Sequence, residues 1–470
     1  MKNVFRRKKA SAVVALLLLL AIVTGSASVV AEDVNWALYN ERAEAFVTAT
    51  ASGDFDVAAD MLDETMTEAA GGASGLQAVW ADITGQAGAF VAIYEIENTF
   101  TQGYFLCDVA SWHENAGVTL RVVFSEDGLI AGLSTLAITE LPGEGEGGGA
   151  SAIPAETRRE GFTDYAVIVG EHTDFPLSGI LSMPDNAAGK VPAVVLVHGS
   201  GANDMDTTIF TNKPFRDIAD YLAANGIAVI RYDKRPFAHG ATMDMNGLTV
   251  REETMEDAIF ATEMLKADPR IDENRVFILG HSLGGMLAPR IHAEGGDYAG
   301  LILFAASPRF LLDVSKAQNY AAIEAMEDGE DKEAALAFME EWDAYYNAFL
   351  TLPDEEAKMT PIPGWGGVTA IYFKDLYENP VSVHIESATV PFLVIQGSND
   401  LQTTADVDFV LYQELLAGRA NATLNLYEGL NHLLMPSTAK SIAELMDEYA
   451  IESRVDSQVL ADIVEWIKGQ

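Results

Sequence analysis

From residue 159 onward, the sequence alternates short apolar runs with amphipathic helical segments, and this alternation constrains the fold more than any other feature. The apolar runs show no polar alternation, so both faces of each strand should be buried, as in a parallel sheet covered by helices on both sides. The expected strands are 191–197, 227–232, 275–279, 301–304, 391–395 and 423–427. Antiparallel edge strands at 165–169 and 178–182 would complete an eight-stranded, mostly parallel sheet of the α/β class.

One stretch interrupts the alternation. Residues 307–390 separate two expected strands and are mostly helical, with a helix at 334–349 that carries Trp342 and several other aromatic residues. An insertion beyond the ends of the strands is the usual place for a lid over a pocket. We therefore expect a lid or pocket wall here. A packing subdomain with no gating role is the alternative.

The segment 139–158, TELPGEGEGGGASAIPAETR, is rich in glycine, proline and acids and predicts a flexible linker between two domains. Before it, helical patterns at 36–51 and 56–66 precede a series of strand-like stretches. Those stretches are 89–94, 103–109, 118–124 and 129–136. Helices followed by a meander predict a small α+β domain over 32–138, in which a curved sheet wraps a helix. We find no catalytic constellation in it and expect an accessory module. The alternative gives this domain the main role.

The first thirty-one residues have the pattern of a secretory signal peptide. Basic residues at 2–9 precede an apolar run at 12–23, and small residues lead to Ala31. The run is shorter than the roughly 20 residues that a membrane span needs, so we expect cleavage after Ala31 rather than a retained anchor. The mature protein should then be secreted or extracytoplasmic, without stable membrane insertion.

The formal net charge of −41 excludes several kinds of partner. Nucleic acids and anionic membranes are themselves negatively charged and require basic surfaces. Cys107 is the only cysteine, so no disulfide framework forms, and we expect this residue to be small, apolar and buried. No group of residues has the spacing of zinc ligands, so neither a metal nor another cofactor is expected.

Ser282 lies in the sequence ILGHSLGG, directly after the apolar run 276–279 and before a helix that begins near Gly284. A sharp turn from strand to helix holds a serine in a strained conformation with its hydroxyl above the sheet, and the glycines remove side chains that would clash. The bare pattern is common by chance, but the strand before it and the helix after it favour a nucleophile over an ordinary glycine-rich turn.

A serine nucleophile needs a base and an acid that orients the base. His432 follows the late strand 423–427, and Asp400 follows the strand 391–395, so both should reach the edge of the sheet where Ser282 lies. The chain order Ser282, Asp400, His432 is that of the α/β-hydrolases. His281 should point away from its neighbour and is expected to be structural.

A fourth motif, HGSG at 198–201, follows the buried strand 191–197. Its small residues allow the backbone to approach a substrate, and the N–H groups of Ser200 and Leu283 would form the oxyanion hole. A phosphate-binding turn is the alternative, but the motif lacks the lysine of a P-loop.

The sequence resembles the secreted bacterial α/β-hydrolase carboxylesterases that are often called lysophospholipase-like or serine-aminopeptidase-like. The segments that carry the resemblance are HGSGANDMD, NKPFRDIADYLAANGIAVIRYDKR, GHSLGG, QGSND and GLNHLLM. FVTATASGDFDVAADMLDETM and FSEDGLIAGL are similar to a cone-shaped α+β domain of unknown function that precedes many of these enzymes. The resemblance covers nearly the whole chain after the signal.

This resemblance implies an α/β-hydrolase fold at 159–470, with Ser282, Asp400 and His432 as the triad and short-chain acyl esters as small-molecule substrates. The family usually has a glycine after RYDKR where this chain has Pro236 and Phe237, so the shape of the loop 236–246 stays open. Two alternatives remain: a serine aminopeptidase or amidase with the same triad, and a binding protein on a hydrolase scaffold. The sequence predicts no oligomeric state.

Overall fold

The computed structural model describes two compact units, one on each side of residue 154. The described residues are 36–101, 104–113, 116–125, 128–140, 156–185, 187–240, 243–324, 326, 328–362, 365 and 368–470. The predicted signal peptide and most of the predicted linker lie outside these residues.

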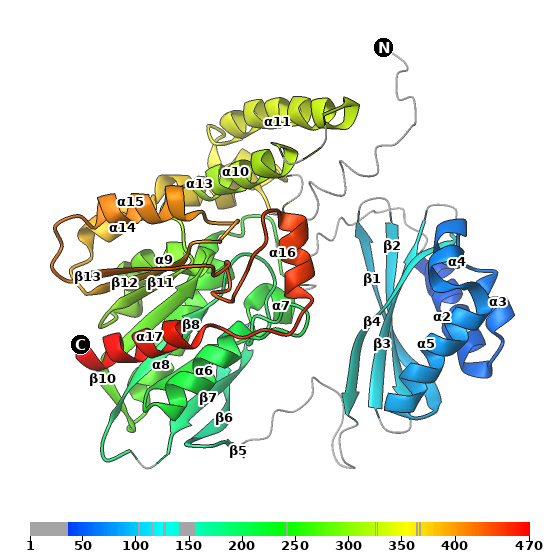
Figure 1. Cartoon of the computed structure of the whole chain (residues 1–470), viewed down its shortest axis with the longest axis horizontal. Coiled ribbons are helices and arrows are strands. Elements are labelled where there is room, and N and C mark those ends of the chain that lie inside the picture. Colours follow the sequence, from blue (N-terminus) through cyan, green and yellow to red (C-terminus); the bar gives the residue numbers. More distant parts are fainter. Residues whose placement is uncertain are drawn as a thin grey trace. The chain divides into compact units, whose positions relative to one another are not determined.

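The N-terminal unit packs helices against one face of a four-stranded antiparallel sheet of order β1-β2-β3-β4, as the expected α+β meander predicted (Figure 1). Its elements are α2 (Trp36–Ser52), α3 (Phe55–Ala59), α4 (Glu64–Ala70), α5 (Gly72–Ala87), β1 (Phe90–Thr101), β2 (Tyr104–His113), β3 (Ala116–Phe124) and β4 (Ile130–Glu140). In its core, the Tyr39 and Phe105 rings stack at 4.0 Å and Cys107 is fully buried, as expected.

Two helices of this unit differ from the prediction. The helix expected at 56–66 is split into α3 and α4, because the Asp63 side chain accepts a hydrogen bond from the N–H of Met66 at 2.6 Å and so caps a new helix. The long helix α5 was not predicted at all. Its first turn contains Gly72 and Gly75, a composition that favours a turn, and only the later apolar residues pack into the core.

The second unit is built on a nine-stranded sheet of order β13-β12-β11-β10-β8-β9-β7-β6-β5 (Figure 1). Its strands are β5 (Glu156–Arg158), β6 (Phe162–Val169), β7 (Leu177–Pro184), β8 (Val191–Val197), β9 (Ala228–Tyr232), β10 (Ile271–His281), β11 (Leu301–Phe304), β12 (Phe392–Gly397) and β13 (Ala422–Tyr427). Strands β8 to β13 pair in parallel, and β5 to β7 form an antiparallel edge. The predicted eight strands are all present.

The ninth strand, β5, is a correction to the predicted linker. Residues 156–158 pair with 163–165 as the outermost strand, and at the other end Thr139 and Glu140 still belong to β4. A three-residue strand beside Pro154 gives too short a pattern to be distinguished from a linker by composition.

Helices cover both faces of this sheet, as expected for strands that are apolar on both sides. They are α6 (Pro214–Ala224), α7 (Arg235–His239), α8 (Glu256–Ala267), α9 (Leu283–Ile291), α15 (Val410–Leu415), α16 (Ile442–Tyr449) and α17 (Ser457–Gly469), with π-helical turns at Arg251–Met255, His292–Gly296 and Ala405–Phe409. Along β8, Val195 and Val197 pack into the core with α8 and α9, whereas Val194 and Leu196 pack into the core with α6 and α17.

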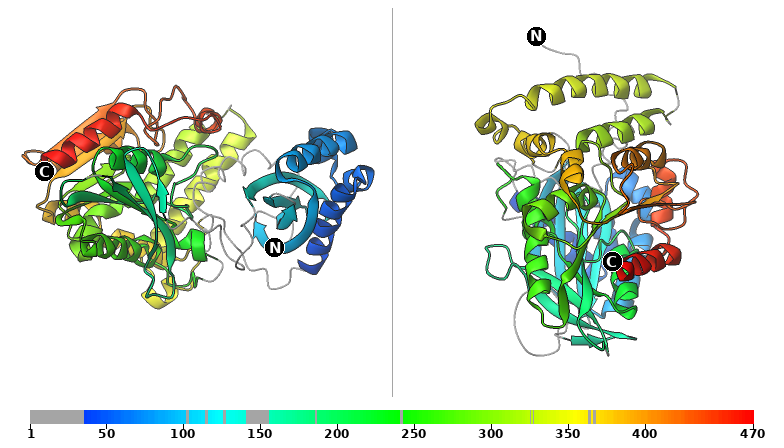
Figure 2. Two further views of the ribbon diagram at one scale, coloured as in Figure 1. Left: turned by 90° about the horizontal axis from the view of Figure 1, so that it is seen from below. Right: turned by 90° about the vertical axis from the view of Figure 1, so that its left-hand side faces the viewer.

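The helical insertion between β11 and β12 contains α10 (Leu311–Glu324), α11 (Glu330–Phe349), α12 (Asp354–Ala357), α13 (Ala370–Glu378) and α14 (Val381–Ser387). Both Figure 1 and the right view of Figure 2 show α11 outermost, with α10 beneath it. Phe349 of α11 packs against Phe373 of α13 at 6.0 Å, and both belong to the same core as the sheet. The insertion is thus packed onto the sheet unit, and its role as a lid stays a prediction.

Candidate active site

The carboxyl ends of β8, β10, β12 and β13 bring the predicted site residues to one edge of the sheet. Ser282 follows β10, Asp400 follows β12, and His432 lies in the loop after β13. The HGSG motif follows β8, which pairs directly with β10. Parallel strands present their following loops at the same edge, so these four loops converge although they are distant in sequence.

The turn at Ser282 has the strained geometry that the sequence predicted. Ser282 has φ 53° and ψ −116°, and it lies between β10 and the first residue of α9. Its N–H donates to the carbonyl of Phe304 at 3.0 Å. A Cβ on Gly280 would lie 2.2 Å from the carbonyl oxygen of Gly284, and a Cβ on Gly284 would lie 2.3 Å from the carbonyl oxygen of Val197. Only glycine fits at these two positions, so the motif is required by backbone packing.

Asp400 and His432 are in direct contact. The His432 Nδ1 lies 2.8 Å from Asp400 Oδ2, and both side chains are buried. Because the carboxylate can only accept, Nδ1 carries the proton and Nε2 is left as the acceptor. This is the tautomer in which an imidazole can take a proton from a hydroxyl.

Asp400 is also held by its own loop. Its Oδ1 accepts the N–H of Gln402 and of Thr403, and its Oδ2 accepts the Gln396 amide at 2.8 Å and the Thr403 hydroxyl at 2.8 Å. Burial by itself would raise the pKa of Asp400, but His432 and the backbone N–H groups outweigh it, so the pKa lies below its usual value. The carboxylate is therefore ionised and available to stabilise an imidazolium.

His281 has a structural role, as expected, and it acts on the candidate base. Its Nε2 donates to the carbonyl of His432 at 3.0 Å, and the two rings lie 4.8 Å apart. Burial and the neighbouring His432 lower the pKa of His281 to about 3, so the ring is neutral. Although Ser282 adjoins His281, its hydroxyl makes no hydrogen bond to the His432 ring in the described part of the chain. Catalytic hydrogen bonds often form only with substrate bound.

The loop after β8 packs against the serine turn. A Cβ on Gly199 would come within 3.1 Å of the Ser282 Cβ, so the backbone at Gly199 runs directly beside the candidate nucleophile. The Asn203 amide donates to the carbonyls of Ser200 and Gly201, each at 3.0 Å, and folds the loop back on itself. Leu283 begins α9, and the N–H of a first helical residue has no acceptor within its own helix.

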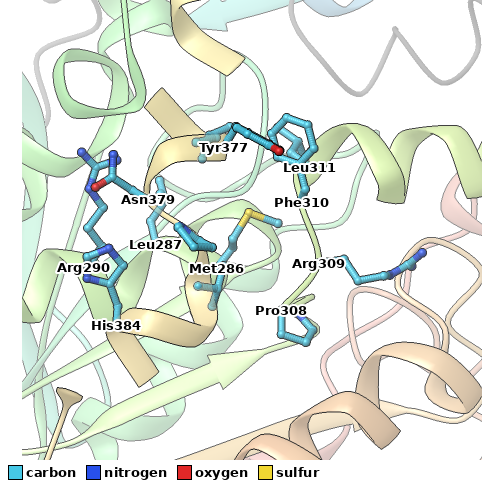
Figure 3. Close-up of a pocket in the computed structure, with 13 residues that line it drawn as sticks. Met286, Leu287, Arg290, Pro308, Arg309, Phe310, Leu311, Tyr377, Asn379 and His384 are labelled. Carbon is cyan, nitrogen blue, oxygen red and sulfur yellow. The ribbon is translucent and has the colours of Figure 1, made fainter. Parts of the chain in front are cut away.

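Figure 3 shows a pocket of about 140 Å³ beside this helix. Met286 and Leu287 of α9 line it together with Phe310, and Met286 lies one turn beyond Ser282. Two arginines at the pocket are already paired with carboxylates, Arg290 with Asp375 at 2.6 Å and Arg309 with Asp408 at 2.8 Å. The remaining lining is mostly apolar, so the pocket suits an uncharged group.

Sequence reasoning did not identify a buried chain of polar groups behind the HGSG loop. Lys234 donates to the carbonyl of Gly199 and to Glu253, which in turn accepts the hydroxyl of Tyr372. Lys234 lies within the RYDKR segment, so its position directly after a buried strand was visible in the sequence. One of its two acceptors is a backbone carbonyl, and no residue type in the sequence indicates such a partner.

Among the described residues, no cluster of three or more His, Cys, Asp or Glu side chains is arranged to hold a metal ion. None of the helices that these residues form is long and apolar enough to cross a membrane.

Comparison with known proteins agrees with the observed fold. Residues 194–445 match the model of the alpha/beta hydrolase family, and residues 43–133 match a family of proteins of unknown function, DUF3887. The chain is 31% identical over 429 residues to Esterase EstD of Thermotoga maritima, in an alignment that covers 91% of this chain and 95% of EstD.

Solved structures with a similar arrangement include an esterase of Pyrococcus furiosus, with a TM-score of 0.41 and 16% identity over 66% of this chain and 91% of that chain. Another is Est1E from Butyrivibrio proteoclasticus, with a TM-score of 0.39 and 17% identity over 64% of this chain and 99% of that chain. The family match spans more than half of the sequence, and the relative aligns over nearly all of it. The chain therefore belongs to the alpha/beta hydrolase family, and the expectations of this fold and of a hydrolase are confirmed.

Proposed function

We propose that this chain is a serine carboxylesterase that hydrolyses small carboxylic esters through an acyl-enzyme on Ser282. The observation that carries the proposal is the buried pair of His432 and Asp400, joined at 2.8 Å, at the edge of the sheet where the strained Ser282 turn lies. The similarity to an esterase over nearly the whole chain supports an ester rather than another acyl substrate.

In the proposed mechanism, His432 Nε2 takes the proton of Ser282 as the serine oxygen attacks the ester carbonyl carbon. The carbonyl oxygen becomes an oxyanion that accepts hydrogen bonds from the N–H groups of Ser200 and Leu283. Asp400 stabilises the imidazolium. As the tetrahedral intermediate collapses, the bond to the alcohol oxygen breaks and His432 donates its proton to the leaving alcohol. Water then repeats the sequence on the acyl-enzyme and releases the acid.

The substrate size proposed is a short acyl chain. The pocket of about 140 Å³ beside Met286 supports this size, because it is small and its cations are already neutralised by carboxylates. We propose that the insertion, whose residues form one side of this pocket, acts as the wall that limits chain length. A Met286→Trp variant should shift the preference toward shorter p-nitrophenyl esters. An unchanged acyl-length profile would show that this pocket does not bind the acyl chain.

The main test is active-site labelling. A fluorophosphonate probe should label the wild-type protein and fail to label Ser282→Ala, and only the wild type should hydrolyse p-nitrophenyl acetate. Labelling that persists in Ser282→Ala would refute the assignment of the nucleophile. Aminoacyl-nitroanilides separate the alternative: cleavage of the anilides without cleavage of the ester would favour a serine aminopeptidase or amidase.

We further propose that residues 1–31 are a cleaved secretory signal and that the mature protein is extracytoplasmic. The basic residues, the apolar run and Ala31 support this proposal. Expression of the full chain in a bacterial host, followed by mass measurement of the exported protein, should give an N-terminus at Glu32. An intact N-terminus in the cytoplasmic fraction would contradict it.

A further inference from the structure

Lys234 is a buried lysine whose ammonium group contacts the loop beside the candidate nucleophile. The Lys234 side chain is 2% exposed, and its Nζ donates to the carbonyl oxygen of Gly199 at 2.9 Å. The backbone N–H of Lys234 also donates to the carbonyl of Asn203 at 2.9 Å, so one residue holds the loop at two points. A buried ammonium group is costly unless it is paired, and Glu253 supplies the pairing at 2.6 Å. The additional bond to the Gly199 carbonyl is the contact that concerns the loop.

The carbonyl of Gly199 and the N–H of Ser200 belong to the same peptide unit. In a planar trans peptide these two groups point in opposite directions, so a donor that fixes the carbonyl also fixes the direction of the N–H. A cation that donates to the carbonyl oxygen withdraws electron density from the peptide and makes its N–H a stronger donor. The reason is that hydrogen bonds along a chain polarise one another. A Cβ on Gly199 would lie 3.1 Å from the Ser282 Cβ, so this peptide begins beside the candidate nucleophile.

We propose that Lys234 is a positioning residue for ester hydrolysis: its ammonium group orients and polarises the Gly199–Ser200 peptide so that the N–H of Ser200 stabilises the oxyanion. This inference rests on the proposed function and adds to it a residue that touches neither substrate nor the triad. It acts through the peptide and only when the carbonyl oxygen of the substrate acquires negative charge.

The surroundings of Lys234 pair its side chain with a carboxylate. Glu253 Oε1 lies 2.6 Å from Lys234 Nζ, and the other carboxylate oxygen, Oε2, accepts the Tyr372 hydroxyl at 2.6 Å. Burial, and then the charge of Glu253, raise the pKa of Tyr372 well above its usual value, so the tyrosine is a neutral donor. Tyr372 lies on α13, so the insertion between β11 and β12 supplies the last of these three hydrogen-bonded side chains.

A purely structural ion pair is the competing explanation, and the chain contains a matched example of one. Arg235 pairs with Asp257 at 2.5 Å, and both side chains are about as buried as Lys234 and Glu253. The recorded hydrogen bonds of the Arg235 guanidinium go to Glu256 and Asp257 rather than to a carbonyl of the HGSG loop. Removing this second pair costs stability in the same way but leaves the oxyanion peptide untouched.

The experiment therefore compares two neutral double variants of the full chain. Lys234→Met with Glu253→Gln removes the polarising charge without leaving a lone buried carboxylate, and Arg235→Met with Asp257→Asn is the control. The measurements are kcat and KM for p-nitrophenyl acetate, the inhibition constant of a trifluoromethyl ketone, and the melting temperature. The ketone adds to the serine oxygen and leaves an oxyanion in the hole, so it reports on the N–H donors directly.

The Lys234 double variant should lose about 10- to 100-fold in kcat with little change in KM, less than removal of a whole donor costs, and bind the ketone weaker by a similar factor. The control should keep wild-type kcat and ketone affinity at a comparable loss of melting temperature. If the first variant does not fold, Lys234→Gln with Glu253→Gln, which keeps a neutral donor, should give an intermediate kcat.

Equal kcat and ketone affinity in the Lys234 variant and in the wild type would overturn the inference, and so would equal losses in the two double variants. Neither result affects the proposed function, which is tested separately by fluorophosphonate labelling of Ser282. If the wild-type protein is not labelled at Ser282, the esterase proposal itself fails.

Discussion

The strained backbone at Ser282 gives a prediction that can be tested without any substrate. At φ 53° and ψ −116°, a residue with a Cβ is in a region that glycine adopts far more readily. Such strain costs about 1–3 kcal/mol. Replacing alanine with glycine at an ordinary position costs about 0.5–1 kcal/mol, because glycine loses more backbone entropy on folding.

These two quantities have opposite signs at Ser282. The strain relieved by glycine exceeds the entropy it costs, so Ser282→Gly should be more stable than Ser282→Ala by about 1–2 kcal/mol. For a domain of this size the corresponding difference in melting temperature is about 1.5–3 °C. Both variants lack the hydroxyl group, so the comparison cancels its contribution.

Scanning calorimetry of the two variants measures the difference. Ala334, an exposed residue within α11, is the control position: there Ala334→Gly should lose stability in the ordinary direction. If Ser282→Ala proves as stable as Ser282→Gly, or more so, the turn is not strained and the argument from its dihedral angles is refuted.

Three further predictions concern the packing, the charge and the acid of the hydrolase unit. Gly284→Ala places a Cβ 2.3 Å from a carbonyl oxygen of β8, so it should cost at least about 2 kcal/mol of unfolding free energy and most of the esterase activity. Gly85→Ala, which meets no atom within 4 Å, should cost neither, and equal effects of the two substitutions would contradict the packing argument. Burial raises the pKa of Asp233 to about 6, so its folded-state pKa exceeds its unfolded one and the free energy of unfolding falls as pH rises from about 4 to 6. Asp233→Asn should therefore match the wild type in urea unfolding at pH 4 and exceed it by about 1 kcal/mol at pH 7.5, allowing for solvent screening, whereas a difference that is constant with pH would refute the assignment. Gln396→Leu removes a donor to Asp400 and should lower kcat about tenfold, since a hydrogen bond to a charged group contributes about 1.5–3 kcal/mol. An unchanged kcat in Gln396→Leu would argue against this role.

The sequence predicted the structure best where the type of side chain itself indicates its environment or its role. All eight expected strands are present, and β8, β9, β11 and β12 are buried along their whole length, so their sequences are largely apolar runs. Asp400 and His432 were paired from their places after successive strands, and the structure brings them to 2.8 Å. The glycines around Ser282 were read as making room, and the clashes at Gly280 and Gly284 give the reason.

Sequence reasoning missed residues and elements whose contacts are not indicated by any local sequence pattern. Lys234 was read as part of a family segment, since nothing in the sequence indicates that its ammonium group meets the carbonyl of Gly199. The motif QGSND was used only to identify Asp400, although the amide of Gln396, its first residue, donates directly to the Asp400 carboxylate. The strand β5 and the helix α5 were missed because three residues, and a glycine-rich first turn, give too weak a local pattern.

The hydrogen bonds to Asp400 have a consequence for how far the hydrolase unit tolerates change. Apart from His432, every recorded donor to this carboxylate comes from the stretch between Gln396 and Thr403. The donors that stabilise the Asp400 carboxylate therefore belong to the same short segment, at the end of β12, as Asp400 itself. A crossover of different length could replace the helices upstream of β12 and leave the carboxylate ionised, whereas the same replacement would remove Tyr372 from Glu253. Chimeras that exchange this crossover should keep the hydrogen bond between Asp400 and His432. They should lose the hydrogen bond from Tyr372 to Glu253, which lies behind the HGSG loop.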